Sequence, residues 1–307
     1  MPNFSSPQVV CRPALPMDAA DVLEFTKFIW DGHDYIKYVW HDWLADPQGI
    51  LAVAEYAGHA VGLGKLTCIS PGHWWLEGLR VDPKFQGLKI SSHIFRYLDD
   101  WWQEHGGGAV RLMTSSERLQ VHHLCGRLGY DKLGEVRAWR AAPLQQGGGN
   151  ASVFQPVGVD ELPQARKLIA ARLQPYGGLM DSGWQFSEPD EPGLRQKIQA
   201  GRLWWWGAEH NGLLAAWEDL DDDERTLGIG FAAVNRESLG AMLQDVLKLA
   251  HGLGYTRVLW MAPVLPWVES SLQAAGYQTE WDGSAYLFGK RPPGRPVKSC
   301  WLSTAQY

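Results

Sequence analysis

The sequence predicts an α/β fold that is built twice along the chain. Short apolar runs of strand length alternate with segments in which apolar residues recur every three or four positions, as in amphipathic helices. The polar, Gly-rich segment 145–152 has the composition of a flexible linker. After it the pattern of strands and helices begins again, and 307 residues suffice for two domains. We therefore expect one domain at 1–144, a second at 153–292 and a tail at 293–307.

The first 69 residues predict a strand, two helices and a hairpin. Residues 9–14 form an apolar opening strand, and Asp18 can cap a helix whose buried stripe extends to Ile29. A second helix is expected from Ile36 to Leu44, because Pro47 follows shortly after and cannot continue a helix. The apolar runs 50–56 and 61–69 are strand-like, and the short link between them, Ala57-Gly58-His59, favours a hairpin.

The stretch from Trp75 to Leu98 combines a strand, a loop and a helix, and we expect it to form the centre of the first domain. The apolar run ends at Asp82-Pro83, and the next helix has its apolar stripe at Ile90, Ile94, Tyr97, Leu98, Trp101 and Trp102. The unpaired N–H groups and the dipole at such a helix N-terminus favour an anion such as phosphate. The three glycines at 106–108 end this helix, and a strand at 110–114, a helix at 117–127 and a strand at 132–141 complete the first half.

The second half repeats this order but is shorter where the loop should be. Strands are predicted at 153–159, around Trp204, at 213–217 and at 227–234, and Asp160 can cap a helix that ends at Leu173. The set His105-Gly106, Arg111, Gly129-Tyr130 recurs as His251-Gly252, Arg257, Gly276-Tyr277, which indicates a tandem duplication. However, 24 positions separate Val81 from His105, whereas 17 separate Val234 from His251. We expect that the second half cannot bind a pyrophosphate in the same manner and instead covers or completes the site of the first.

The composition argues against several classes of function. A net charge of −6 disfavours broad nucleic-acid binding, and no apolar run approaches the roughly 18–20 residues of a membrane span. The start of the chain lacks the basic and apolar blocks of a signal peptide. The four cysteines, Cys11, Cys68, Cys125 and Cys300, show no metal-ligand spacing, so we expect no bound metal and a reduced, cytoplasmic setting. Most of the 17 Trp residues are expected in the core, and a few could line a pocket for a flat or aliphatic substrate.

The loop Gln86-Gly87-Leu88-Lys89-Ile90-Ser91 resembles the acetyl-CoA loop of the GCN5-related N-acetyltransferases, whose pattern is Arg/Gln-x-x-Gly-x-Gly/Ala. Lys89 stands where the family usually has Gly, and Ser91 stands at the small-residue position. The resemblance implies a mixed, mostly antiparallel sheet flanked by helices in each half, with the second half degenerate. It also implies acetyl-CoA as co-substrate, bound by this loop and by a strand that splays from its neighbour. The expected contacts are Leu79, Arg80, Val81, Gln86, Gly87, Leu88, Lys89, Ile90, Ser91 and Ser92.

Three segments within the first hundred residues resemble one branch, the vertebrate histidine N-acetyltransferases: Asp34-Tyr35, Trp43-Leu44-x-Asp46-Pro47 and Glu77-Gly78-Leu79-Arg80-Val81. This resemblance suggests the α-amine of an amino acid as acceptor. Trp30, Asp34 and Tyr35 would then lie at the acceptor entrance, with Asp34 holding an ammonium group and Trp30 or Tyr35 contacting a side chain. Alternatively, Asp34 simply caps the second helix.

Acetyl transfer to an amine needs a base for the ammonium proton and a proton donor for the leaving thiolate. Glu77 is the candidate base, because an apolar strand raises the pKa of a carboxylate; alternatively it pairs with Arg80 or Lys65. Cys125 is the candidate acid, because it stands at the position of the family's Tyr; alternatively it is a small buried apolar residue. His122 or His123 could supply the proton instead, and Tyr130 is expected to be a core ring.

These expectations add up to an N-acetyltransferase that acts on the primary amine of a small molecule, such as an amino acid, as a monomer or homodimer. The rival hypothesis is a non-catalytic acyl-CoA-binding or ligand-sensing protein, which Lys89, Cys125 and the shortened second half favour. A protein acceptor is a third hypothesis, less favoured because the second domain would crowd the groove that a peptide needs. Neither nucleic acid nor a membrane is expected as a partner.

Overall fold

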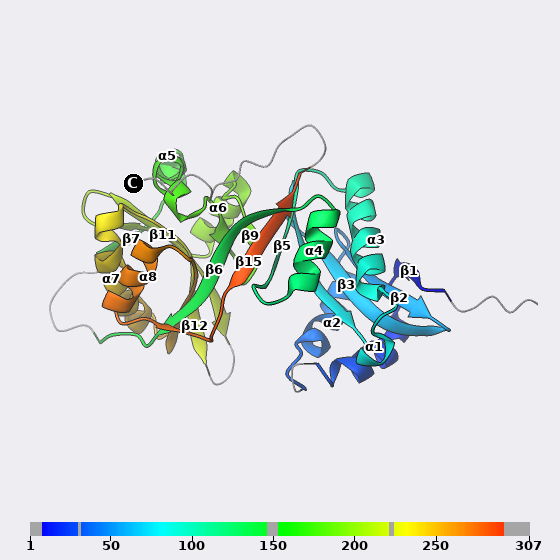
Figure 1. Ribbon diagram of the computed structural model, residues 1–307. Coiled ribbons are helices and arrows are strands. Elements are labelled where there is room, and N and C mark those ends of the chain that lie inside the picture. Colours follow the sequence, from blue (N-terminus) through cyan, green and yellow to red (C-terminus); the bar gives the residue numbers. More distant parts are fainter. Residues whose placement is uncertain (1–7, 30–31, 146–152, 221–223, 292–307) are drawn as a thin grey trace, which may run out of the picture. The chain divides into compact units, whose positions relative to one another are not determined.

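The fold is that of a computed structural model, which describes residues 8–29, 32–145, 153–220 and 224–291 (Figure 1). The chain divides into two compact units. Of the described residues, the first unit contains those up to Leu112 together with 120–131 and 289–291, and the second contains 113–119 and the rest of 132–288. Each unit has a largely antiparallel sheet with flanking helices, as predicted. Within the described ranges, no helix is both long and apolar enough to pass through a bilayer.

The first unit has the predicted order of strands and helices. The elements are β1 (Val10–Pro13), α1 (Ala19–Thr26), α2 (Ile36–Ala45), β2 (Ile50–Tyr56), β3 (His59–Ser70), β4 (His73–Val81), α3 (Ile90–His105), β5 (Ala109–Ser115) and α4 (Leu119–Arg127). The sheet order is β1-β2-β3-β4-β5, and every neighbouring pair is antiparallel except β4 and β5. Ala57 and Gly58 both have positive φ, which is the geometry of a two-residue hairpin turn between β2 and β3.

The helices of the first unit lie on opposite faces of its sheet. This follows from the residues of β3, which face the two sides in turn. Leu63 belongs to a buried cluster with Val22 and Phe25 of α1 and with Ile36 and Trp40 of α2. The neighbouring residues Gly62 and Gly64 face the other way, where a Cβ atom would lie within 3 Å of side chains of α3. Glycine at these two positions therefore lets α3 approach the sheet closely, which places the N-terminus of α3 beside the end of β4.

The second unit repeats the order with small additions. Its elements are β6 (Asp131–Ala141), β7 (Phe154–Pro156), α5 (Leu162–Arg172), β8 (Met180–Asp181), β9 (Phe186–Ser187), α6 (Glu191–Gln199), β10 (Leu203–Trp206), β11 (Gly212–Leu220), β12 (Arg225–Ala233), α7 (Leu239–Gly252), β13 (Arg257–Pro263), α8 (Pro266–Ala274), β14 (Gln278–Thr279) and β15 (Ala285–Lys290). The main sheet runs β15-β6-β13-β12-β11-β10-β7. Because β6 pairs with β13 from Val258↔Ala141 to Pro263↔Val136, the last strand of the sequence's first half belongs to the second unit's sheet. A fragment that starts at residue 153 would lack this strand.

Two predicted helix caps are wrong, because each carboxylate is used elsewhere or lies outside the helix. Asp18 precedes α1 but makes no cap bond; its carboxylate accepts from the Leu15 amide at 2.7 Å and pairs with Arg12 at 2.8 Å. In the second unit α5 begins at Leu162 after a short 3₁₀ turn, and Glu161, not Asp160, accepts a hydrogen bond from the backbone, at 2.7 Å from the Gly158 amide. Tertiary and turn contacts thus override local capping preferences.

The buried carboxylate of Asp181 makes the stability of the chain depend on pH. Asp181 ends β8, is 1% exposed, and accepts from the Trp184 amide at 2.7 Å and from Trp217 Nε1 at 3.2 Å. Burial raises its pKa to about 7. Since the folded state keeps a proton that the unfolded state loses above about pH 4, the free energy of unfolding should fall as pH rises from 4 to 7 and then level off.

We therefore predict that the free energy of unfolding decreases by about 2 kcal/mol between pH 5.5 and 7.5. Over most of that range the unfolded chain binds about one proton fewer than the folded chain. Asp181→Asn, which keeps an oxygen acceptor, should flatten this dependence and stabilise the chain above pH 7. Urea unfolding of both proteins across the pH range measures the effect. An Asp181→Asn variant with the same pH slope as the wild type would contradict the prediction.

Candidate functional site

The most irregular part of the first unit's sheet lies in β4. β4 and β5 pair only from His73↔Ala109 to Trp75↔Arg111, so the remainder of β4 is not paired with β5. On its other edge, β4 pairs with β3 with a shift in register, since Glu77 is opposite Lys65 but Arg80 is opposite Leu63. The extra residue forms a β-bulge at Gly78-Leu79. The bulge changes the direction of the backbone in the part of β4 that is not paired with β5.

Gly78 is required at this bulge for two reasons. Its φ is +67°, and a Cβ atom there would lie 2.5 Å from the ring of Trp43. Trp43 is on α2 and stacks edge-on against Tyr35, with 5.9 Å between ring centroids. The bulge is therefore held against an aromatic wall that comes from the helices preceding the sheet.

The loop between β4 and α3 is exposed and has the geometry of an anion site. Gln86, Gly87, Leu88 and Lys89 are all exposed, and α3 begins at Ile90. Among the described residues, we find no acceptor for the backbone N–H groups of Gly87, Leu88 and Lys89, whereas the amides of Ser92 and His93 bond to the Lys89 carbonyl at 2.9 and 3.1 Å. Open N–H groups at the start of a 16-residue helix are suited to bind a phosphate group. Ser91 and Ser92 lie in the first turn of this helix.

Lys89 adopts a backbone conformation that is common for glycine and uncommon for lysine. Its φ of +56° and ψ of +26° lie in the left-handed region, and it is the N-cap residue of α3. A non-glycine residue in this region is strained by roughly 1–2 kcal/mol. The Lys89 side chain is exposed.

Glu77 has a defined hydrogen-bond partner at the edge of the bulge. Its Oε1 atom accepts from the Thr67 hydroxyl at 2.6 Å, and its side chain is half-buried. Lys65, one of the two cations expected as alternatives, is fully buried and bonds to Asp46 and to the Leu66 carbonyl. The hydrogen bond from Thr67 favours the charged form of the carboxylate, which is the form a general base needs.

The predicted acceptor residues Asp34 and Tyr35 lie beside Arg80. The carboxylate of Asp34 is 3% exposed, accepts from Arg80 Nε at 2.6 Å, and also accepts from the Ile36 amide at the start of α2 at 3.0 Å. The guanidinium of Arg80 stacks over the Tyr35 ring at 5.4 Å. Burial raises the pKa of Tyr35, and the charges of Arg80, Glu77 and Asp34 all act on it, which places these four groups in one neighbourhood. Asp34 thus both supports the helix and holds an ion pair; Trp30 lies outside the described residues.

The proposed proton donors on α4 are less well placed. Cys125 is fully buried and burial raises the pKa of its thiol to about 12, so it stays protonated at neutral pH and is remote from solvent. This environment favours the alternative, a small apolar core residue. Tyr130 is a core ring, as expected, and its hydroxyl donates to Asp99 at 3.1 Å. His123 is exposed and His122 half-buried on the same helix. Among the described residues there is no cluster of three His, Cys, Asp or Glu that could bind a metal.

Three contributors to this site were missed at the level of sequence: Thr67, Trp43 and the bulge at Gly78. Thr67 reaches Glu77 because the bulge shifts the register between β3 and β4. A glycine inside a strand pattern, as Gly78 is between Glu77 and Leu79, is a signal for a bulge that could have been used.

The sequence and fold of this chain are similar to those of known acetyltransferases. Residues 18–130 match the model of the acetyltransferase (GNAT) family. Probable N-acetyltransferase 16 of Homo sapiens is 26% identical over 223 residues, which are 65% of this chain and 60% of the human protein. The chain therefore spans less than two thirds of that relative.

Solved structures resemble the chain over nearly its whole length. A GCN5-related N-acetyltransferase from Sphaerobacter thermophilus is 14% identical, with a TM-score of 0.62 over 94% of this chain and 98% of that chain. An acetyltransferase of Pyrococcus horikoshii, described as putative, is 15% identical, with a TM-score of 0.56 over 95% of this chain and 92% of that chain. At these identities the likeness shows a shared fold.

Proposed function

We propose that the chain is an acetyl-CoA-dependent N-acetyltransferase that acts on the primary amine of a small molecule, with amino acids as the leading class of acceptor. The observation that supports this most directly is the position of Glu77, half-buried beside a bulge on a splayed strand, in a domain that matches the GNAT family. The open helix N-terminus at Gly87–Ile90 supplies the anion site that the diphosphate of acetyl-CoA needs.

In the proposed reaction the residues of β4 do most of the chemistry. Glu77 takes a proton from the substrate ammonium, and the resulting amine attacks the carbonyl carbon of the acetyl group. Backbone N–H groups of Leu79 and Val81, exposed by the splay, stabilise the negative charge on the carbonyl oxygen. The new C–N bond forms as the C–S bond breaks, and the nitrogen releases its second proton to become the amide. The CoA thiolate takes up a proton, for which Cys125, His122 and His123 are the candidate donors on α4.

An amino-acid acceptor is supported by the charged groups around Tyr35. A zwitterionic substrate needs an anionic partner for its ammonium group and a cationic partner for its carboxylate. Glu77 provides the first and Arg80, held by Asp34, provides the second, and Tyr35 and Trp43 provide an aromatic wall for a side chain. A simpler amine, without a carboxyl group, would contact Glu77 alone.

The decisive experiment is a thiol-release assay with the full chain, acetyl-CoA and a panel of amines. The panel compares amino acids with their amides and with the corresponding amines that lack the carboxyl group. Turnover with any of these supports the enzyme, and a preference for the free amino acid supports Arg80 as carboxylate partner. Saturable acetyl-CoA binding without turnover for any amine would support the rival, a ligand-sensing protein.

We predict that Lys89→Gly separates two roles of this residue. Glycine relieves the left-handed strain, so the free energy of unfolding should rise by about 0.5 kcal/mol after the entropy cost of glycine is subtracted. Loss of the charge should weaken acetyl-CoA binding about threefold to tenfold and make it less sensitive to salt. Urea unfolding and calorimetric titration measure the two effects.

Lys89→Met is the control, because it removes the charge but keeps the strain; it should weaken binding without raising stability. Tighter binding by Lys89→Gly than by the wild type would show that the lysine obstructs the site, and the proposed anion site would then need revision.

A further inference from the structure

The connection between the first two helices of the second unit contains a hairpin of its own. Eighteen residues, 173–190, connect α5 to α6, compared with nine, 27–35, between α1 and α2. The longer connection contains β8 and β9, which within the described part of the chain pair with each other and form a sheet apart from the main one. An isolated two-stranded hairpin is marginally stable in water, so this hairpin depends on its packing against the rest of the unit.

The hairpin packs against β12 at a bulge. The register between β11 and β12 shifts between Ala215 and Ala216, which makes Gly230 the extra residue of β12. A Cβ atom at Gly230 would lie 2.7 Å from the carbonyl oxygen of Asp181 and 3.5 Å from Met180 Cγ. Glycine at the bulge therefore lets the hairpin approach the strand closely.

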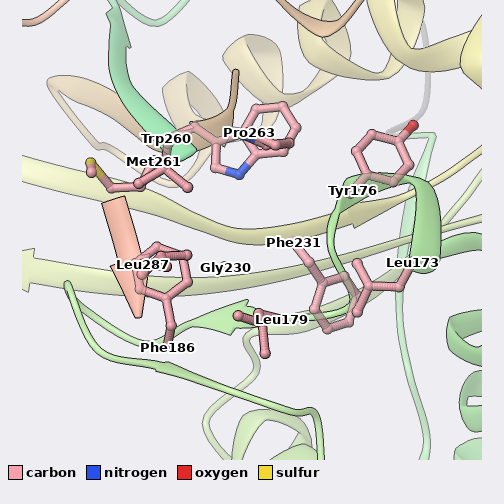
Figure 2. Close-up of a pocket in the computed structure, with 11 residues that line it drawn as sticks. Leu173, Tyr176, Leu179, Phe186, Gly230, Phe231, Trp260, Met261, Pro263 and Leu287 are labelled. Carbon is pink, nitrogen blue, oxygen red and sulfur yellow. The ribbon is translucent and has the colours of Figure 1, made fainter. Parts of the chain in front are cut away.

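The hairpin fills the space where β12 and β13 diverge. The two strands pair only as far as Ile229↔Trp260. Beyond this point Figure 2 shows Phe186 of β9 and Leu179 on one side of a cavity and Met261 of β13 on the other. Phe186 is buried, and the cavity has a volume of about 20 Å³, room for about one water molecule. The hairpin thus covers the open part of the sheet with apolar side chains.

The turn of the hairpin is strained. Gly183 and Trp184 have φ values of +86° and +69°, and the Ser182 amide bonds to the Gln185 carbonyl across them at 2.9 Å. This is the geometry of a two-residue hairpin turn, which glycine tolerates and which strains a bulky residue. The exposed ring of Trp184 stacks on that of Trp281, with 5.5 Å between ring centroids and 19° between ring planes. The stack offsets part of the strain and ties the turn to the segment before β15.

A buried carboxylate holds this turn to the core of the unit. Asp181 is 1% exposed, and its two oxygens accept from the Trp184 amide at 2.7 Å and from Trp217 Nε1 of β11 at 3.2 Å. Both donors are uncharged. The charged group that acts on Asp181 is the half-buried Lys197 of α6, while β12 faces it with Gly230, which does not titrate.

Ionisation of Asp181 disfavours the closed position of the hairpin. Burial raises the pKa of this carboxylate to about 7, whereas a hydrated aspartate has a pKa of about 4. A hairpin that lifts off β12 hydrates the carboxylate, so opening releases a proton between pH 4 and 7 and becomes about tenfold more favourable with each pH unit in this range. Above pH 7 the carboxylate is ionised in both positions, and opening no longer depends on pH.

We propose that the β8–β9 hairpin is a pH-dependent flap of the second unit, which is closed over β12 while Asp181 is protonated and opens locally when Asp181 is ionised. Its two-residue strands, its strained turn and its separation from the main sheet make it the part that opens before the main sheet does. The proposal does not depend on the activity of the first unit.

The test is amide hydrogen exchange in the full chain, followed by NMR from pH 5 to 8.5. The readout is the protection factor of the Ser182 and Trp184 amides, which corrects for the pH dependence of the exchange chemistry itself. This factor should be lower than that of the buried Leu227 amide in β12, fall about tenfold per unit between pH 5 and 6.5, and level off above pH 7.5. Asp181→Asn, which cannot ionise, should remove the pH dependence.

A second variant separates the stack from the carboxylate. Trp281→Leu removes the stack, so it should lower the protection of the hairpin amides about threefold to tenfold at every pH and leave the pH slope unchanged. The matched control is Leu253→Ala, at a 41% exposed position after α7, which should leave this protection unchanged.

Two results would overturn the proposal, and both come from the wild type, so they stay decisive if a variant does not fold. Hairpin amides as protected as the Leu227 amide would show that the hairpin opens only when the whole unit unfolds. Protection of the hairpin amides that does not change with pH would show that Asp181 does not control the opening. A pH slope that persists in Asp181→Asn would also overturn it.

Discussion

Replacing Glu77 by Gln should lower kcat/KM for the amine at least tenfold near neutral pH while the affinity for acetyl-CoA stays the same. The carboxamide keeps the size of the side chain and can still bond to Thr67, but it cannot accept a proton from the ammonium group. A tenfold loss corresponds to about 1.4 kcal/mol of transition-state stabilisation, and general base catalysis typically contributes about a hundredfold or more, so tenfold is a lower bound. Steady-state kinetics with the best amine from the thiol-release assay measures it.

The matched control is Glu104→Gln on α3, where the side chain is 73% exposed and the change should have no effect. Thr67→Val offers a subtler test, because it removes the hydrogen bond to Glu77 but keeps the base. It should lower activity less than Glu77→Gln, because the base itself remains and only its orientation is affected. Unchanged kinetics for Glu77→Gln would remove Glu77 from the mechanism.

The order of elements in the first unit was predictable because the spacing of apolar residues along each element clearly matches either a helix or a strand. The stripe of α3, for example, recurs at Ile90, Ile94, Leu98 and Trp102, all of them buried. The caps at Asp18 and Asp160 were not predictable, because a carboxylate near a helix start has several possible partners and the fold decides among them. Likewise, β6 looks like the last strand of the first half, and its pairing with β13 depends on contacts far away in the sequence.

The candidate site was predictable only in part, for a related reason. The positions of Asp34, Tyr35, Glu77 and Arg80 follow from the resemblance, and the charges acting on Tyr35 place all four together. The contribution of Thr67 depends on register, which a one-residue bulge changes and which no propensity encodes. The small cavity of the second unit was missed because its residues come from β6, β9, β12, β13, β15 and the segment after α5, which the sequence keeps apart.

Replacing Lys290 by Met should destabilise the chain by about 3 kcal/mol, because it leaves a buried carboxylate without its cation. Asp99 on α3 is 3% exposed, and Lys290 Nζ bonds to its Oδ2 atom at 2.7 Å. The same ammonium group lies 5.5 Å from the Tyr130 ring centroid and 5.7 Å from that of Trp102. Lys290 and Asp99 both belong to the first unit, so this ion pair is a contact within that unit.

The measurement is urea unfolding, with Lys248→Met as the surface control. Lys248 pairs with Asp245 at 2.8 Å on α7 but is 45% exposed, so its loss should cost no more than about 0.5 kcal/mol. Adding Asp99→Asn to Lys290→Met should recover part of the loss, because the carboxamide is uncharged and its one oxygen can still accept from either Tyr130 or Gln103, which bond to different oxygens of Asp99. If Lys290→Met cost no more than Lys248→Met, the buried pair would contribute no more to stability than an exposed ion pair, and the prediction would be wrong.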